Sequence, residues 1–177
     1  MAFRGVTGNI PDVTDDHQLK ITGSVESDLE YASEVNGKAY SWSSSFATAG
    51  TDVEVISIKN TSSSDVLVID EIVVCATGAC VFTLFEVTSG TSAGTTITGQ
   101  NLNLSSGLSA PATSYGNAAV TGSLSGNTLA YQCVTAGDST ILDTKGGLVL
   151  GQDDEIALTA SANTTVYVTL IGHYKEL

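Results

Sequence analysis

Positively charged residues are scarce in this sequence. Its 177 residues contain 6 Lys and Arg against 19 Asp and Glu, which gives a formal net charge of −13. No Lys or Arg occurs between Lys59 and Lys145. Because binding to phosphates depends on cationic side chains, the composition argues against nucleic acid or an anionic membrane as the partner. The acidic charge suits a protein kept soluble at high copy number, or one that meets a basic or cation-bridged protein surface.

Long hydrophobic runs and long helix-forming stretches are also missing. The polar sequence that follows Met1-Ala-Phe-Arg-Gly-Val offers no run long enough for a signal peptide or a membrane span, so we expect synthesis in a cytoplasm and no membrane partner. Apolar residues make up 42% of the chain, only 14% is charged, and 18 glycines with many Ser and Thr replace the usual helix formers. This composition favours a single all-β domain.

Cysteine and histidine are too few to build a covalent or metal framework. Three cysteines, Cys75, Cys80 and Cys133, do not make a disulfide scaffold. Cys75 and Cys80 flank a four-residue turn, where a bridge and a pair of small buried thiols both stay open. His17 and His173 lie at opposite ends of the chain, without the spacing of a metal site. The sequence therefore predicts no metal and no cofactor.

No catalytic motif occurs. The chain has many serines but no G-x-S-x-G elbow and no Cys/His arrangement of a nucleophilic enzyme. Asp70-Glu71 and Asp153-Asp-Glu155 are the dense carboxylate groups, but neighbours on a strand point to opposite faces, which suits exposed turns better than a glycosidase pair. A weak calcium site at 153–155 is the open alternative. The prediction is a protein without catalytic residues.

Strand patterns recur at regular spacing from Lys38 onward. Residues 66–75 are almost continuously apolar and β-branched, which predicts a central strand buried on both faces. The turn after them leads into residues 80–87, and we expect these two strands to form a hairpin. A second hairpin is expected from residues 118–124 and 128–134 across Ser125-Gly-Asn127.

The closing stretch predicts two strands around an acidic turn at Gln152-Asp-Asp154, then a polar turn and a long final strand. From Val166 onward the residues alternate between two usable faces. A terminal strand this apolar must pair centrally in a sheet or lie against a neighbouring chain. Together with the long irregular segment 99–117, it predicts self-association.

The N-terminal residues 1–37 differ from the rest. They carry 7 of the 19 acidic residues, with apolar residues scattered singly among them, and Asn36-Gly37 is a turn signal that marks a boundary. A partly disordered acidic terminus, a short strand near residues 19–25 that joins the sandwich, and an arm that orders on another subunit all stay open. For the arm, the partner-binding candidates are Phe3, Val6, Ile10 and Val13. The chain is thus divided into an acidic arm, 1–37, and a β domain, 38–177.

Three stretches carry a resemblance to a known group of proteins. They are Val66-Leu-Val-Ile-Asp-Glu-Ile-Val-Val, Phe82-Thr-Leu-Phe-Glu-Val-Thr-Ser-Gly-Thr-Ser-Ala-Gly-Thr with Gln100-Asn-Leu-Asn, and Leu148-Val-Leu-Gly-Gln-Asp-Asp-Glu-Ile-Ala-Leu with Val168-Thr-Leu-Ile-Gly-His-Tyr. Over residues 38–177 the chain resembles tailed-bacteriophage virion proteins with a jelly-roll sandwich. The resemblance implies an antiparallel β-sandwich of jelly-roll type with an N-terminal extension, an accessory structural role, and a homotrimer.

The functional expectation is a non-enzymatic capsid decoration or cement protein on the virion surface, which binds the major capsid protein or another virion protein. The absence of a coiled-coil or repetitive shaft favours this compact role over a long receptor-binding fibre. The alternative is a carbohydrate- or receptor-binding β-sandwich module of a tail or head fibre, with Trp42 or tyrosines stacking on sugars, although core packing of these rings is favoured. A glycan-degrading enzyme is a third reading, disfavoured because no acid/base pair is visible.

Overall fold

The computed structural model describes residues 12–13, 19–20, 27–48, 50, 52–90, 92, 94–116 and 124–176. A two-residue strand β1 (Asp12–Val13) pairs antiparallel with β2 (Leu19–Lys20). The other elements are α1 (Asp28–Glu34), β3 (Ala39–Ala47), β4 (Val53–Asn60), β5 (Asp65–Ala76), β6 (Cys80–Ser89), β7 (Thr95–Thr96), β8 (Gln100–Asn101), β9 (Ala112–Gly116), β10 (Ser125–Val134), β11 (Ser139–Leu150), β12 (Glu155–Ala160) and β13 (Thr165–Glu176).

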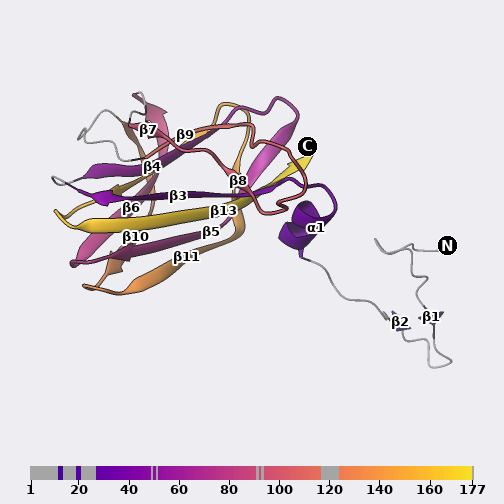
Figure 1. The fold of residues 1–177 in the computed structure, drawn as a ribbon, viewed down its shortest axis with the longest axis horizontal. Coiled ribbons are helices and arrows are strands. Elements are labelled where there is room, and N and C mark those ends of the chain that lie inside the picture. The colour runs from indigo at the N-terminus through magenta and orange to yellow at the C-terminus, as the bar shows by residue number, and fades with distance from the viewer. Residues whose placement is uncertain are drawn as a thin grey trace.

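The strands from β3 onward form two antiparallel sheets that pack face to face (Figure 1). The order is β10-β6-β12-β4-β9-β7 in the six-stranded sheet and β11-β5-β13-β3-β8 in the five-stranded sheet. The chain is folded back on itself, so that β3 pairs with β13, β4 with β12, β5 with β11 and β6 with β10. This nested pairing is the topology of a jelly roll. The predicted antiparallel β-sandwich of jelly-roll type is confirmed.

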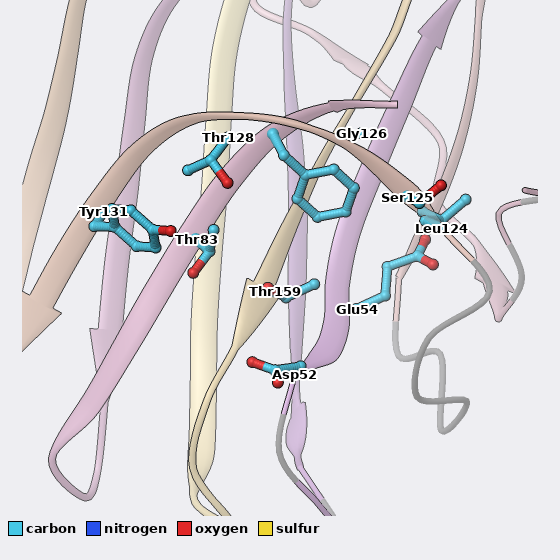
Figure 2. A pocket seen from close by; sticks show the side chains of 10 residues that line it. Asp52, Glu54, Thr83, Leu124, Ser125, Gly126, Thr128, Tyr131 and Thr159 are labelled. Carbon is cyan, nitrogen blue, oxygen red and sulfur yellow. The ribbon is translucent and has the colours of Figure 1, made fainter. Parts of the chain in front are cut away.

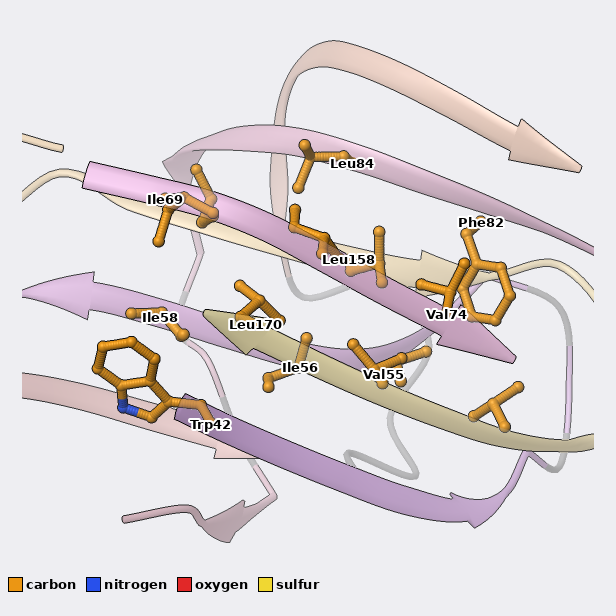
Figure 3. Close-up of a cluster of buried hydrophobic side chains, with 14 of the residues drawn as sticks. Trp42, Val55, Ile56, Ile58, Ile69, Val74, Phe82, Leu84, Leu158 and Leu170 are labelled. Atoms are coloured by element: carbon orange, nitrogen blue, oxygen red, sulfur yellow. The ribbon is translucent and has the colours of Figure 1, made fainter. Parts of the chain in front are cut away.

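Apolar side chains from both sheets interdigitate between the layers (Figure 3). From the five-stranded sheet Trp42 and Leu170 enter the core, and from the six-stranded sheet Ile56, Phe82 and Leu158 meet them. Trp42 has no exposed surface. The expectation that this ring packs in the core, and does not stack on a sugar, is confirmed.

The closing strand β13 lies centrally, between β5 and β3. Its residues Val166, Val168 and Leu170 are buried in the core, whereas Tyr167 on the other face is 48% exposed. Central pairing therefore accounts for the apolar character of β13, which no longer argues for a neighbouring chain. The predicted turn before β12 is also present, and Asp153 takes a left-handed conformation there with φ of 67°.

Both predicted hairpins are wrong. Strand β5 pairs with β11 and β13, whereas β6 pairs with β10 and β12, so residues 77–79 carry the chain from one sheet to the other. A turn signal specifies that the chain reverses, but the partner of each strand is set by distant segments. The expectation that this strand is buried on both faces is wrong as well. Burial alternates along residues 72–76 of β5, so its outer face is only partly buried.

The Ser125-Gly-Asn127 segment does not form a turn but lies inside the continuous strand β10. Gly126 sits at a shift of register between β10 and β6, and a Cβ atom there would come within 1.5 Å of the Glu86 carbonyl oxygen. Gly126 is needed because the two backbones approach closely there. A glycine in a sequence is equally compatible with a turn and with such a close approach, so the pattern alone does not distinguish them. Residues 118–123 of the expected hairpin lie outside the described part of the chain.

Helix α1 was not anticipated from the sequence. Ser27 caps it with a capping box, in which the Ser27 side chain accepts from the Glu30 N–H and the Glu30 carboxylate accepts from the Ser27 N–H. Ala32 is buried where the helix packs on the five-stranded sheet. The Ser-x-x-Glu spacing was a readable signal for this helix. Of the strand expected near residues 19–25, only β2 lies within the described residues.

The cysteines are free thiols in this structure. Cys80, on β6 of the six-stranded sheet, points into the core. Cys75, on β5 of the five-stranded sheet, is half-buried and lies on the face away from the core. Of the two possibilities left open by the sequence, a disulfide bridge and a pair of thiols, the structure has the thiols. Among the described residues there is no helix with the length and apolar character of a membrane span.

Candidate functional site

A row of outward-pointing side chains crosses the six-stranded sheet on the face away from the core. Tyr131 of β10 pairs with Thr83 of β6, Thr83 with Thr159 of β12, and Thr159 with Glu54 of β4. Directly opposed residues of antiparallel strands share a face, so these four side chains line up across four strands. At about 4.8 Å per strand step the row spans roughly 14 Å.

A β-bulge places Glu54 in this row. The register between β12 and β4 shifts so that Leu158 pairs with Ile56 and Thr159 with Glu54, which leaves Val55 as the extra residue. The bulge puts Glu54 and Ser57 on the same outer face although they are three positions apart. A strict alternation assigns these two side chains to opposite faces.

The row forms the floor of a cavity of about 420 Å³ (Figure 2). Figure 2 shows Glu54 and Tyr131 on opposite sides of the cavity, with Thr83 and Thr159 between them. The lining is completed by the start of β10, by a second residue of β6 and by the residue before β4, with the residues Asp52, Phe85, Leu124, Ser125, Gly126 and Thr128. Four hydroxyl side chains of Ser and Thr, two carboxyl groups and two aromatic rings therefore face one volume.

The Glu54 carboxyl group is the most unusual member of the cavity. Glu54 is only 4% exposed, and its Oε1 atom has no hydrogen-bond partner. Burial raises the pKa of Glu54, the nearby charge of Glu155 raises it further, and the Ser57 and Ser92 hydroxyls beside it act in the opposite direction. The Ser57 Oγ atom is likewise buried without a partner, so the contact between these two groups is not a well-formed hydrogen bond. The Glu54 carboxyl group therefore has an unused acceptor atom that a further hydrogen-bond donor would satisfy.

Glu54 is expected to make the fold less stable as the pH rises. Because its pKa in the folded state lies above the ordinary glutamic-acid value, the folded chain binds more protons than the unfolded chain between these two values. The free energy of unfolding therefore falls as the pH rises through that window. Denaturant titrations of Glu54→Gln should show a gain in stability over the native chain that is larger at pH 7.5 than at pH 4. The exposed Glu86→Gln controls for the loss of one negative charge, and an equal gain at both pH values would contradict the assignment.

A second cavity, of about 370 Å³, lies between α1 and the end of β13. His173 lines it and is 3% exposed; its Nδ1 atom is 2.8 Å from Oδ2 of Asp70, and its Nε2 atom has no hydrogen-bond partner. A carboxylate that holds Nδ1 fixes the orientation of the ring, as in many catalytic and metal-binding histidines. The cavity also brings together Lys38, paired with Asp65, and Lys175, paired with Asp28.

The two cavities differ in their chemistry: the first holds the carboxyl groups of Asp52 and Glu54, and the second is built around the imidazole of His173. The residues that line the His173 cavity include no Ser, Thr or Cys that the imidazole would activate as a nucleophile. Within the described ranges, no group of three or more His, Cys, Asp and Glu side chains is arranged to hold a metal ion.

A third feature is an apolar loop between β8 and β9, which we name the leucine loop (residues 102–110). Leu104 is 94% exposed, and Leu108 and Leu102 are 51% and 40% exposed. Asparagine side chains hold the loop in shape: the Asn101 Oδ1 atom accepts from the Asn103 N–H at 2.8 Å, and the Asn103 Oδ1 atom accepts from the Ser105 N–H at 3.1 Å. The leucines are therefore presented on an ordered backbone.

The loop is also tied to the segment at α1. Asn103 donates through Nδ2 to the Ser33 carbonyl at 3.1 Å, and Asn101 donates to the Gly37 carbonyl at 2.6 Å. The surrounding sequence is unusual as well, because residues 87–137 contain no Asp, Glu, Lys, Arg or His although the chain carries a net charge of −13. An ordered loop that exposes leucines is a feature of contact sites.

Of the partner-binding residues predicted from the sequence, Phe3, Val6 and Ile10 lie outside the described residues. Val13 belongs to β1, and its side chain is not described. Sequence reasoning did single out the segment 99–117, which contains the leucine loop. It missed Glu54 and the His173–Asp70 pair, because the first depends on a bulge and the second joins positions 103 residues apart.

Comparisons with known proteins find no matching family profile, no matching curated protein and no matching solved structure.

Proposed function

We propose that this chain is a non-enzymatic structural protein of a tailed-phage virion, which binds the assembled head as a decoration or cement protein. The observation that carries the proposal is the leucine loop, an ordered apolar surface with Leu104 almost fully exposed. A small protein gains nothing in its own stability from holding a leucine in water. The same side chain contributes about 25 cal/mol for every Å² that a partner covers.

Fold and charge agree with this proposal. Jelly rolls build many viral capsid domains, although the same fold also builds lectins, so the fold alone is an argument by analogy. The leucine loop lies within the stretch 87–137, which carries no charged side chain of its own. The partner is the major capsid protein or another protein of the head, and neither nucleic acid nor a membrane is involved.

A homotrimer is part of the same proposal. Strand β10 is an edge of its sheet, and it lies within the uncharged stretch. An edge strand without charged side chains is suited to contact with a further chain. Light scattering on the purified protein, carried out before any binding assay, tests the trimer. The measured mass should be three times the 18.1 kDa of one chain, and a mass of one chain would contradict self-association.

The proposal is tested by binding to heads that were assembled without this protein. Leu104→Asp should lower the amount that co-sediments with such heads at least tenfold, because it places a charge at the centre of the apolar contact. Ile141→Asp is the matched control, since Ile141 is also exposed, at 54%, but lies on β11. Equal binding of the native chain and Leu104→Asp would contradict the role of the loop, and a gene with no head or portal gene nearby would contradict the virion assignment.

The N-terminal arm is examined in the same assay. Phe3, Val6, Ile10 and Val13 supply scattered apolar anchors in a segment whose acidic charge would steer the encounter. Deletion of residues 1–17 should leave the circular dichroism and the melting temperature unchanged while most head binding is lost. Undiminished binding by the folded truncation would remove the arm from the proposal and leave the leucine loop as the contact.

A further inference from the structure

The cavity over the row Tyr131–Thr83–Thr159–Glu54 has no role in the head-binding proposal. It lies on the outer face of the six-stranded sheet, and its volume of about 420 Å³ is within the range of small-molecule sites. Its chemistry can be examined without reference to a virion.

The lining of the cavity selects against anions. Among the described residues it contains Asp52 and Glu54 but no Lys, Arg or His, and the chain as a whole carries a net charge of −13. Phosphorylated, sulfated or carboxylated ligands would meet only like charge there. The ligand must therefore be neutral or cationic.

The polar groups of the cavity match a ligand with many hydroxyl groups. Thr83, Thr128 and Thr159 each offer a hydroxyl that donates one hydrogen bond and accepts others, and the carboxyl groups add acceptors. The Ser125 hydroxyl is hydrogen-bonded to that of Ser89 at 2.6 Å. Sugar hydroxyls have the same dual character, so one saccharide can satisfy both kinds of group. An ammonium or guanidinium ion only donates, and it would leave the hydrogens of the three threonine hydroxyls without an acceptor.

Glu54 adds the observation that points to a ligand. Its side chain is 4% exposed, and the unpartnered Oε1 atom belongs to a residue that lines the cavity (Figure 2). Buried polar atoms are almost always hydrogen-bonded, and leaving one unpaired is unfavourable. A ligand hydroxyl at this end of the cavity would complete the missing hydrogen bond.

Aromatic rings supply the apolar contact that sugar rings also need. Tyr131, at the opposite end of the row, is 69% exposed, and Phe85 contributes a second ring to the lining. Aromatic faces pack against C–H groups while the tyrosine hydroxyl remains available for a hydrogen bond. We propose that this cavity binds a neutral saccharide, with Glu54 and the two threonines of the row holding its hydroxyl groups and Tyr131 contacting its ring.

The probe for the first test is an array of neutral, amino and sialylated glycans applied to the purified full chain. At least one neutral glycan should bind, and sialylated glycans should not. The assay uses no heads, so its failure and the failure of head binding are separate results. Binding of amino compounds such as arginine amide without any neutral glycan would overturn the proposal in favour of a cation site, and no glycan binding at all would overturn it outright.

Variants then locate the site with the methyl glycoside of the bound sugar. Thr83→Val and Thr159→Val remove one hydroxyl each and keep the β-branched shape that strands favour, so the fold should be retained. Each should weaken binding about tenfold, as should Glu54→Ala. Thr140→Val, on β11 of the other sheet, is the matched control and should bind as the native chain does. Unchanged affinity in the Thr83→Val/Thr159→Val double variant, with its melting temperature intact, would show that the sugar binds elsewhere.

Discussion

Replacing Trp42 by alanine should lower the free energy of unfolding by about 3–5 kcal/mol, the largest effect of a single substitution that we expect in this chain. Trp42 has no exposed surface, and it is the largest side chain in the core between the two sheets. Its ring lies 6.0 Å from that of Tyr40, centroid to centroid, and the other side is closed by Gly99, where a Cβ atom would come within 2.5 Å of the indole nitrogen. Alanine would leave a cavity that neither neighbour can fill.

Urea denaturation of Trp42→Ala, Trp42→Phe and Leu104→Ala measures this effect. The phenylalanine variant should lose less, because it keeps an aromatic ring and removes an indole N–H that has no hydrogen-bond partner. Leu104→Ala is the control for loss of an apolar side chain at an exposed position and should stay within about 0.5 kcal/mol. A loss below about 1 kcal/mol for Trp42→Ala would mean that the core is not centred on this ring.

Replacing Asn60 by alanine should lower the free energy of unfolding by about 2–4 kcal/mol, because it breaks a buried polar link between the sheets. Asn60 ends β4 and has no exposed surface. Its Nδ2 group donates to the carbonyls of Asp65 and Leu150, both at 3.0 Å, and its Oδ1 atom accepts from the Ser62 N–H at 2.9 Å. Since Leu150 ends β11 in the other sheet, the side chain fastens the β4–β5 connection to the end of β11.

Asn127→Ala is the matched control for Asn60→Ala. Asn127 also donates a side-chain hydrogen bond, at 3.1 Å to Glu86, but this contact is exposed, so its loss should cost less than about 0.5 kcal/mol. Asn60→Asp keeps the shape and the acceptor atom while it turns a carboxylate toward two carbonyls, and it should be at least as damaging as alanine. Equal stability of Asn60→Ala and Asn127→Ala would refute the idea that Asn60 links the sheets.

The sequence alone was sufficient for the fold class. The alternation from Val166 onward and the acidic turn at 152–154 follow from local chemistry, and the structure contains both of them. Helix α1 was equally readable from Ser27-Asp-Leu-Glu30 and was overlooked among scattered acidic residues. These features depend on neighbours within a few positions, which is the range over which propensity and capping act.

Strand pairing and both cavities were decided by the tertiary structure. The sequence at residues 77–79 predicts a hairpin turn, but the chain crosses from one sheet to the other there. The reason is that β5 pairs with β11 and β13, whereas β6 pairs with β10 and β12. The bulge at Val55 turns Glu54 outward, and the register of three strand pairs brings Tyr131, Thr83 and Thr159 into line with it. A period of two predicts which residues share a face of one strand, but it carries no information about which strand lies next to it or where a residue is inserted. For this reason the all-β class was accessible from composition and pattern, and the jelly-roll type only through the resemblance, whereas the carboxyl group at the end of the cavity became visible only when the strands were paired.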